Sequence, residues 1–364
     1  MTSNLEHSLV RHFSPAWYAA VMGTGGLANV FYLFGSALAF LRPVAIGLWI
    51  LNTLMFLVLI GPWTARWILH FDRLAEDLRH PMMSNFFVTM PVGALVLGTN
   101  FFLMGKGILA LQLIAGLALV LWIFGILTIL FFGVLVVYNM IVRESMVPEM
   151  VNFSWFITPV ASIVVPLLGN PLVAYYAARN AGGASLINLV DISFYGIGLL
   201  LFLIIGSILF NRLIHHEMPH PMVAPTFWII LGPIGVGTLS LMGIGDASTL
   251  LGLIGSAQGI YFAALVMWGF GLWALALTLA ISVRYLRESG IPFSLSWWAF
   301  IFPLAAYAMS AYSVSAYLHL KAIFWYAGLL AVLLTLLWLV VFARSAVALA
   351  KGELLRPAAQ AVRR

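Results

Sequence analysis

Ten long apolar stretches divide this chain of 364 residues, and they constrain its fold more than any other feature. About 20 helical residues cross the ~30 Å hydrocarbon core of a bilayer, so stretches of this length are typical of membrane-spanning helices. Backbone groups in lipid must be hydrogen-bonded within the chain, and the short alternating segments of a β-barrel are absent from the sequence. The expected spans lie near 14–34, 43–69, 84–104, 107–138, 153–175, 188–212, 225–246, 252–284, 296–316 and 322–344. The sequence therefore predicts an all-α integral membrane protein with ten transmembrane helices.

The composition agrees with this fold class and excludes several alternatives. Charged residues make up 8% of the chain, against roughly 25% in soluble domains. There is no cysteine, which excludes disulfides and thiolate chemistry. No cleavable signal pattern precedes the first span, and no long polar extension is present. We expect one transmembrane domain over 1–364, with 346–364 as a cytoplasmic tail, in the plasma or inner membrane of the cell.

The basic residues predict an orientation. Thirteen Lys and Arg residues fall in the first tail, the last tail and the linkers after even-numbered spans, and four fall on the opposite side. The four are Arg42, Lys106, Arg179 and Lys321. Cytoplasmic loops carry the excess of Lys and Arg, so we expect both termini in the cytoplasm.

An internal repeat links the odd-numbered stretches. Their core sequences are AWYAAVMGTGG, SNFFVTMPVGA, NFSWFITPVAS, TFWIILGPIGV and SWWAFIFPLAA. Each carries an aromatic residue five or six positions before a shared helix breaker, which is Gly23, Pro91, Pro159, Pro233 or Pro303. A second marker precedes several of them, namely His80-Pro81-Met82, Pro148-Glu149-Met150 and His220-Pro221-Met222. The spacing predicts five repeats of about 70 residues, over 12–80, 81–148, 149–219, 220–290 and 291–345.

These repeats predict an architecture. Each repeat holds two spans and therefore forms a helical hairpin, and successive hairpins keep the same orientation. Five equivalent hairpins favour a ring with quasi-fivefold symmetry around a central pore. The odd-numbered helices carry the breakers while the even-numbered helices are uniformly apolar, so we expect the odd set to line the pore and the even set to face lipid.

The aligned breakers and their preceding residues are the candidate pore site. Proline removes a helical hydrogen bond and biases the residue before it away from helical geometry, so we expect kinks at one depth in five helices. The residues just before the breakers are Met22, Met90, Thr158, Gly232 and Phe302. Phe302 is the largest, and an aromatic side chain in an apolar pore can block it. A phenylalanine packed in the protein interior is the alternative that spacing alone leaves open.

The charge pattern favours anions as cargo. No Lys, Arg, Asp or Glu lies inside an odd-numbered span away from its ends, and Asp191 and Asp246 fall near the outer ends of their spans. Intramembrane carboxylates usually mark proton relays or cation sites, so a carboxylate-based pump is disfavoured. All five odd helices begin at the basic face, where the positive end of a helix dipole favours anions. Candidate N-caps there are Ser14, Asn85, Asn152, Thr226 and Ser296.

The sequence gives no sign of an enzyme. The stretch His216-Glu217-Met218-Pro219-His220 matches the H-E-x-x-H pattern of zinc proteases, but that chemistry needs a helix and two prolines interrupt this segment. We expect no metal, no cofactor, no nucleic-acid partner and no catalytic residue.

Several motifs in register resemble the tellurite-resistance/dicarboxylate transporter family. They are Phe13-Ser14-Pro15-Ala16-Trp17-Tyr18, Met22-Gly23-Thr24-Gly25, the His-Pro linkers and Trp297-Trp298-Ala299-Phe300-Ile301-Phe302-Pro303, and the resemblance covers about 12–345. That family includes bacterial TehA, fungal malate permeases, sulfite efflux pumps and plant slow anion channels. The resemblance implies five hairpins around a pore, often in a homotrimer, and a gating phenylalanine at Phe302. The glycine stretch of the first helix corresponds to residues 23–26.

The resemblance also suggests a cargo. We expect transport of C4-dicarboxylates such as malate, through a channel or transporter gated by Phe302. The alternative is a channel or exporter for small inorganic anions such as chloride, nitrate, sulfite or tellurite. A channel and a coupled carrier are both compatible with the sequence.

Overall fold

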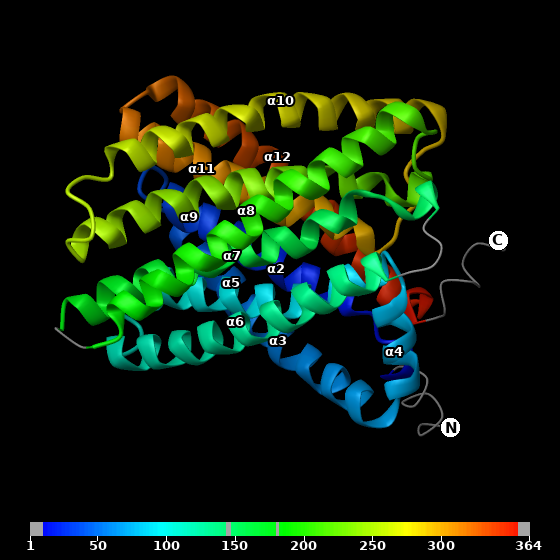
Figure 1. The fold of residues 1–364 in the computed structure, drawn as a ribbon, viewed down its shortest axis with the longest axis horizontal. Coiled ribbons are helices and arrows are strands. Elements are labelled where there is room, and N and C mark those ends of the chain that lie inside the picture. The colour runs from blue at the N-terminus through cyan, green and yellow to red at the C-terminus, as the bar shows by residue number, and fades with distance from the viewer. Residues whose placement is uncertain (1–9, 143–146, 180–181, 356–364) are drawn as a thin grey trace.

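The computed structural model of the chain describes residues 10–142, 147–179 and 182–355. Ten long helices run roughly side by side within it (Figure 1). Five of them, the inner helices, are α2 (Tyr18–Phe34), α5 (Thr89–Met104), α7 (Ile157–Ala177), α9 (Leu231–Leu250) and α11 (Ile301–Leu318). The other five, the outer helices, are α3 (Leu41–Leu69), α6 (Leu111–Ile141), α8 (Ala184–His215), α10 (Gln258–Glu288) and α12 (Lys321–Ala350). Each inner helix packs against the outer helix that follows it in the chain.

Short 3-10 helices lead into the inner helices. These are η1 (Pro15–Trp17), η2 (Met83–Val88), η4 (Phe153–Phe156), η5 (Pro221–Ile230) and η6 (Leu295–Phe300). The remaining elements are the amphipathic helix α4 (Phe71–Arg79) and the turns η3 (Pro148–Met150) and η7 (Glu353–Leu355). Residue 10 and the end of α12 lie at the same end of the molecule (Figure 1). We call this end, where the inner helices begin, the N-terminal face.

The inner helices contact one another in a closed cycle. Helix α2 packs against α5 and α11, α7 packs against α5 and α9, and α9 packs against α11. The 3-10 helices repeat this cycle, because η1, η2, η4, η5 and η6 also contact in order and η6 contacts η1. The five inner helices therefore surround a common axis, while the outer helices lie outside them.

Burial separates the two sets of helices. For four inner helices, taken with their 3-10 segments, 78–83% of the most apolar window is buried, whereas the outer helices bury 28–33%. The exposed residues of the outer helices are largely apolar, as in Leu57, Val120, Leu203, Phe262 and Leu329. Such a surface is stable only against lipid. The chain is a multi-pass membrane protein.

Nine helices in the described residues are long and apolar enough to cross a membrane. Helix α2, with 17 residues, is not among them. It nevertheless occupies one place in the cycle of inner helices. The tenth span and the fivefold repeat therefore stay predictions.

The four breaker prolines lie inside the apolar spans, at the change from 3-10 to α geometry rather than in the middle of the α-helical part. Pro91, Pro159, Pro233 and Pro303 are each the third residue of their α-helix, directly after a 3-10 segment. The first four N–H groups of an α-helix have no acceptor within it, so proline there costs no α-helical hydrogen bond. The prolines mark the change from 3-10 to α geometry. In α2, Gly23 stands in place of the proline, and the α-helix begins at Tyr18, five residues before Gly23.

Two of the predicted N-caps are confirmed and three are wrong. The side chains of Ser14 and Asn152 accept backbone N–H groups at the starts of η1 and η4. Asn85, Thr226 and Ser296 lie inside η2, η5 and η6 instead, because the 3-10 segments extend these helices toward the N-terminal face.

The histidines of the His-Pro linkers accept backbone N–H groups near the starts of η2 and η5. Nδ1 of His80 accepts the N–H groups of Met82 and Met83 at 3.3 and 3.2 Å, and Nδ1 of His220 accepts the N–H of Met222 at 3.2 Å. In both repeats the imidazole accepts the N–H group two residues further on, which caps η5 at His220 and holds the turn that precedes η2 at His80. This explains why the His-Pro-Met marker recurs in the sequence.

Four outer helices hold the segment that precedes their own inner helix. Each sends one side-chain donor to a backbone carbonyl there: Arg66 to Phe13 (2.7 Å), Asn139 to Leu78 (3.0 Å), Arg212 to Pro148 (3.1 Å) and Tyr285 to Pro219 (2.6 Å). In the fifth hairpin the direction reverses, and Trp298 donates to Ser345 at 3.0 Å. These bonds fix the start of each inner helix relative to its outer helix.

The backbones of α9 and α11 approach each other closely at Gly235. A Cβ atom at this position would lie against the backbone N of Tyr307 and 2.7 Å from its Cα atom. Backbone atoms cannot move aside as a flexible side chain can. Glycine therefore lets the two helices approach closely, as small residues do in other membrane bundles.

We expect Gly235→Ala to force α9 and α11 apart and to lower the free energy of unfolding by about 1–3 kcal/mol, the usual cost of overpacking. The matched control is Gly196→Ala on outer helix α8, where no described atom lies within 4 Å of the added Cβ. Thermal unfolding in detergent should give a lower Tm for the first variant only. Equal melting temperatures for both variants would contradict the contact.

Candidate functional site

The ten predicted pore residues all lie buried in the cycle of inner helices. They are Met22 and Gly23 on α2, Met90 and Pro91 on α5, Thr158 and Pro159 on α7, Gly232 and Pro233 on α9, and Phe302 and Pro303 on α11. On the last four helices they occupy the second and third positions, and on α2 the fifth and sixth. The structure thus places all ten near the starts of the inner α-helices.

Phe302 lies against a glycine of the first helix. Its side chain is 4% exposed. A Cβ atom built on Gly26 would lie 3.7 Å from Cδ2 of Phe302 and 2.9 Å from Cβ of Ala305. Glycine at 26 is therefore needed for the close approach of Ala305, and the aromatic ring lies at ordinary contact distance beside it, between α2 and α11.

Two glycines of the candidate set are packing positions. A Cβ on Gly23 would meet Ile301 at 2.9 Å and Trp298 at 3.1 Å. A Cβ on Gly232 would meet Val160 of α7 at 3.2 Å and Pro303 of α11 at 3.9 Å. Glycine at 232 thus faces both neighbouring inner helices, whereas glycine at 23 faces α11.

Thr158 uses its hydroxyl group within the protein. Its Oγ1 donates to Oδ1 of Asn85 at 3.0 Å, and Nδ2 of Asn85 donates to the carbonyl of Pro81 at 2.9 Å. Both side chains are buried. This pair connects the second hairpin to the third at the depth of the candidate site, a role that the sequence pattern did not reveal.

A second polar cluster, unnoticed in the sequence, lies deeper along the inner helices. Asn100 receives a hydrogen bond from Asn52 (3.0 Å) and donates to Asn29 (2.6 Å) and to the carbonyl of Gly25 (3.0 Å). All three asparagines are buried, on α2, α3 and α5. Three asparagines spread over 71 residues of sequence carry no local signal, so only the packing shows that they meet.

Asp191 is deeper in the protein than its sequence position suggested. It is the eighth residue of outer helix α8 and is 0% exposed. Its Oδ1 accepts the indole N–H of Trp122 at 3.2 Å, and its carboxyl group fills the space left by Gly169 on α7. It lies between α6, α7 and α8, so it belongs to packing between hairpins rather than to the candidate pore residues.

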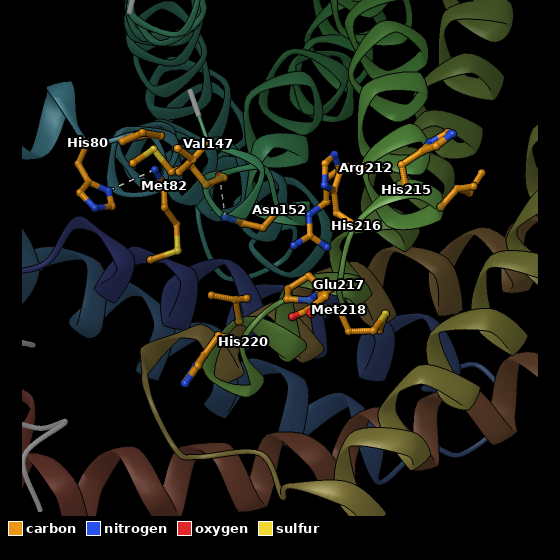
Figure 2. Close-up of a pocket in the computed structure, with 15 residues that line it drawn as sticks. His80, Met82, Val147, Asn152, Arg212, His215, His216, Glu217, Met218 and His220 are labelled. Carbon is orange, nitrogen blue, oxygen red and sulfur yellow. Dashed lines mark hydrogen bonds between the residues drawn. The ribbon is translucent and has the colours of Figure 1, made fainter. Parts of the chain in front are cut away.

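A pocket of about 760 Å3 opens at the N-terminal face. The linkers leading into η2, η4 and η5 enclose it (Figure 2). Its polar lining consists of His80, Asn152, Arg212, His215, His216, Glu217 and His220. His80 and Met82 form one wall, and Arg212 approaches from the opposite side at the end of α8 (Figure 2). The sequence motifs include His80, His216 and His220, but they do not reveal that these histidines converge on one pocket with Arg212.

Three arginines of the first hairpin lie near His12 at the N-terminal face. Burial, together with the nearby cations Arg11, Arg73 and Arg66, lowers the pKa of the His12 imidazole below its usual value. Cations that disfavour a further positive charge favour a negative one. Arg11, Arg66 and Arg73 are also paired with the carboxylates of Asp72, Asp77 and Glu76, which offset part of this positive charge.

The H-E-x-x-H segment is not arranged as a metal site. Helix α8 ends at His215, the backbone of His216 is extended, and Nδ1 of His220 is engaged in capping η5. Among the described residues, no group of three His, Asp or Glu side chains could hold a metal ion.

We expect Thr158→Val to remove the Thr158–Asn85 hydrogen bond at nearly constant volume. The buried Oδ1 of Asn85 then loses its donor, which should lower the free energy of unfolding by about 1 kcal/mol. Thr53→Val is the control, because Thr53 donates only to the carbonyl of Trp49 in its own helix. Thermal unfolding of both variants in detergent measures the difference. An unchanged Tm for Thr158→Val would show that this bond contributes nothing to joining the hairpins.

Comparison with known proteins identifies the chain at the level of family. Residues 12–346 match the voltage-dependent anion channel family (SLAC1). An uncharacterized transporter of Methanocaldococcus jannaschii, MJ0576, is 35% identical over 307 residues, 84% of each chain. The sulfite efflux pump SSU1 of Trichophyton rubrum is 25% identical over 95% of this chain and 93% of the pump. The S-type anion channel SLAH2 of Arabidopsis thaliana is 24% identical over 74% of this chain and 45% of the channel.

These relatives are transporters and channels rather than enzymes, and the resemblance drawn from the sequence motifs is confirmed. The match spans nearly all of the described helices. The chain belongs to the voltage-dependent anion channel family and is a membrane transporter or channel for anions.

Proposed function

We propose that the five inner helices enclose an anion pathway that the ring of Phe302 closes. The observation that carries this proposal is the closed cycle of inner helices, with Phe302 and four other breaker-adjacent residues near the start of each. The 3-10 segments extend the pathway toward the N-terminal face. Phe302 rests against Gly26, so a change in its rotamer or in the spacing of α2 and α11 would alter the opening.

The charge distribution supports anions as the permeating species. In the described inner helices the only charged side chain is Asp246, which lies near the far end of α9. A cation pathway would need carboxylates or carbonyl ligands along its length. At the N-terminal face, basic side chains and the starts of five helices raise the local concentration of anions.

Small inorganic anions are the cargo that the relatives favour. The fungal relatives that align over nearly the whole chain are sulfite efflux pumps by name, and the plant relative is an anion channel. We therefore propose sulfite and anions of similar size as first candidates. C4-dicarboxylates such as malate, expected from the sequence motifs, form the second candidate class and are tested beside them.

The proposal includes the arrangement around the pathway. We propose ten membrane spans in five quasi-equivalent hairpins, with α2 as the tenth span and with repeats at 12–80, 81–148, 149–219, 220–290 and 291–345. The excess of Lys and Arg at the N-terminal face supports a cytoplasmic position for that face and for both termini. The family resemblance and the exposed apolar outer helices support a homotrimer in the cell membrane.

We expect Phe302→Ala to raise anion flux into proteoliposomes by at least about tenfold, which corresponds to about 1.4 kcal/mol removed from the barrier. Deleting the ring leaves an opening beside Gly26, where no side chain can fill it. Uptake of sulfite, nitrate, chloride and malate should be measured for wild type and variant at matched protein density. A rise for the inorganic anions without malate would favour the first cargo class.

The control is Phe300→Ala, two residues earlier in the chain. Phe300 is also buried, and its ring packs against Trp228 and Trp297 rather than against Gly26. This variant removes the same volume and should leave flux unchanged. The gate proposal fails if Phe302→Ala conducts no better than wild type, or if both variants leak equally.

A further inference from the structure

Two buried arginines occupy corresponding places in the first and third hairpins. Arg66 lies near the end of outer helix α3 and Arg212 near the end of outer helix α8. Each donates to a backbone carbonyl that precedes the inner helix of its own hairpin, at Phe13 and at Pro148. The side-chain environment beyond this shared bond differs between them.

The charge of Arg66 is neutralised within the protein. Its Nη2 donates to Oδ2 of Asp77 at 2.6 Å, and its Nη1 donates to the carbonyl of Phe13 at 2.7 Å. The Arg66 side chain is 5% exposed and that of Asp77 is 28% exposed. A buried cation held in this way by a carboxylate is the arrangement that low-polarity surroundings require.

No such partner of Arg212 is found among the side chains that the structure describes. The residue is 6% exposed, its Nε is used by the Pro148 carbonyl at 3.1 Å, and its buried Nη1 has no hydrogen-bond acceptor in the described chain. No carboxylate of the described residues lies within 4 Å of its guanidinium group. Nε of Arg66 is likewise without an acceptor, so the difference between the two arginines is the carboxylate. A buried guanidinium group is costly unless a negative charge is supplied to it.

The unpaired group lines the pocket at the N-terminal face. The other titratable side chains that line this pocket are His80, His215, His216, Glu217 and His220. Glu217 contributes one negative charge to the wall, and Arg212 contributes one positive charge from a buried position. The volume of about 760 Å3 is ample for a small anion with part of its hydration shell.

We propose that this pocket is a binding site for a small oxyanion, with the guanidinium group of Arg212 as its anchor. The anion would accept hydrogen bonds from Arg212 as the Asp77 carboxylate does from Arg66. The planar fork of arginine donors suits two oxygens of one anion, as in carboxylate, sulfite or nitrate, better than a spherical halide. This inference rests on the proposed anion function and adds a loading site at the mouth, away from Phe302.

The experiment measures binding rather than flux. Purified protein is titrated with sodium sulfite, and separately with nitrate and malate, at an ionic strength held constant with sodium chloride, while its Tm is recorded. We expect an oxyanion-dependent rise in Tm for wild type. Arg212→Lys keeps the positive charge and a donor for Pro148 but loses the fork. It should weaken the apparent affinity about tenfold, the factor for one lost charge-assisted hydrogen bond.

Two further variants serve as controls. Arg284→Lys changes an exposed arginine near the same end of the next outer helix, where it pairs with Glu288, and should bind as wild type does. Glu217→Gln removes the carboxylate from the pocket wall and should tighten binding. Because Glu217→Gln leaves Arg212 unchanged, its affinity tests the proposed site even if Arg212→Lys does not fold.

Three results would each overturn the proposed site. They are wild-type oxyanion affinity in Arg212→Lys, a loss of affinity in Arg284→Lys equal to that in Arg212→Lys, and unchanged affinity in Glu217→Gln. The gate proposal is judged separately by flux. If Phe302→Ala fails to open the pathway while Arg212-dependent binding holds, the gate is wrong and the site stands. If the gate opens and Arg212→Lys binds as wild type does, the site alone is wrong.

Discussion

The structure depends on the requirement that backbone groups inside a membrane find hydrogen-bond partners within the protein. The inner helices meet it while beginning with 3-10 geometry, since Pro91, Pro159, Pro233 and Pro303 each lie at the third α-helical residue, where the missing N–H costs no α-helical bond. The carbonyls that precede these segments are bound by the outer helices. Arg66, Asn139, Arg212 and Tyr285 each supply one such bond. These bonds hold the starts of four inner helices in place within the closed ring.

Small residues then set the distances within the ring. Gly235 allows the backbones of α9 and α11 to approach closely, and Gly26 allows the close approach of Ala305 beside Phe302. Buried polar pairs join neighbouring hairpins, as between Thr158 and Asn85. Without a hydrophobic driving force between helices in lipid, such close packing and interhelical hydrogen bonds are what hold a membrane bundle together. The same features that stabilise the ring therefore define the walls around the proposed pathway.

The proposed pathway and its mouth differ in charge. The inner helices expose almost no charge to one another, whereas the N-terminal face concentrates arginine and histidine side chains. An anion is thus attracted to the face by long-range fields and meets an apolar constriction beyond it. Arg66 and Arg212 occupy corresponding positions in two hairpins. Arg66 is paired with Asp77 and stabilises the structure, whereas Arg212 has an unused Nη1 and is available to a ligand.

The sequence alone determined the fold class, the length and pairing of the helices, the positions of the breakers and the family. These follow from hydrophobic runs and motifs, which are local signals, because lipid imposes the same rule on every span. The sequence did not show that the prolines follow 3-10 segments, that the imidazoles of His80 and His220 accept backbone N–H groups, or that Asn29, Asn52 and Asn100 meet. Nor could it distinguish Arg212 from Arg66. Whether a buried group has a partner depends on which helices pack together, and only the tertiary structure decides that.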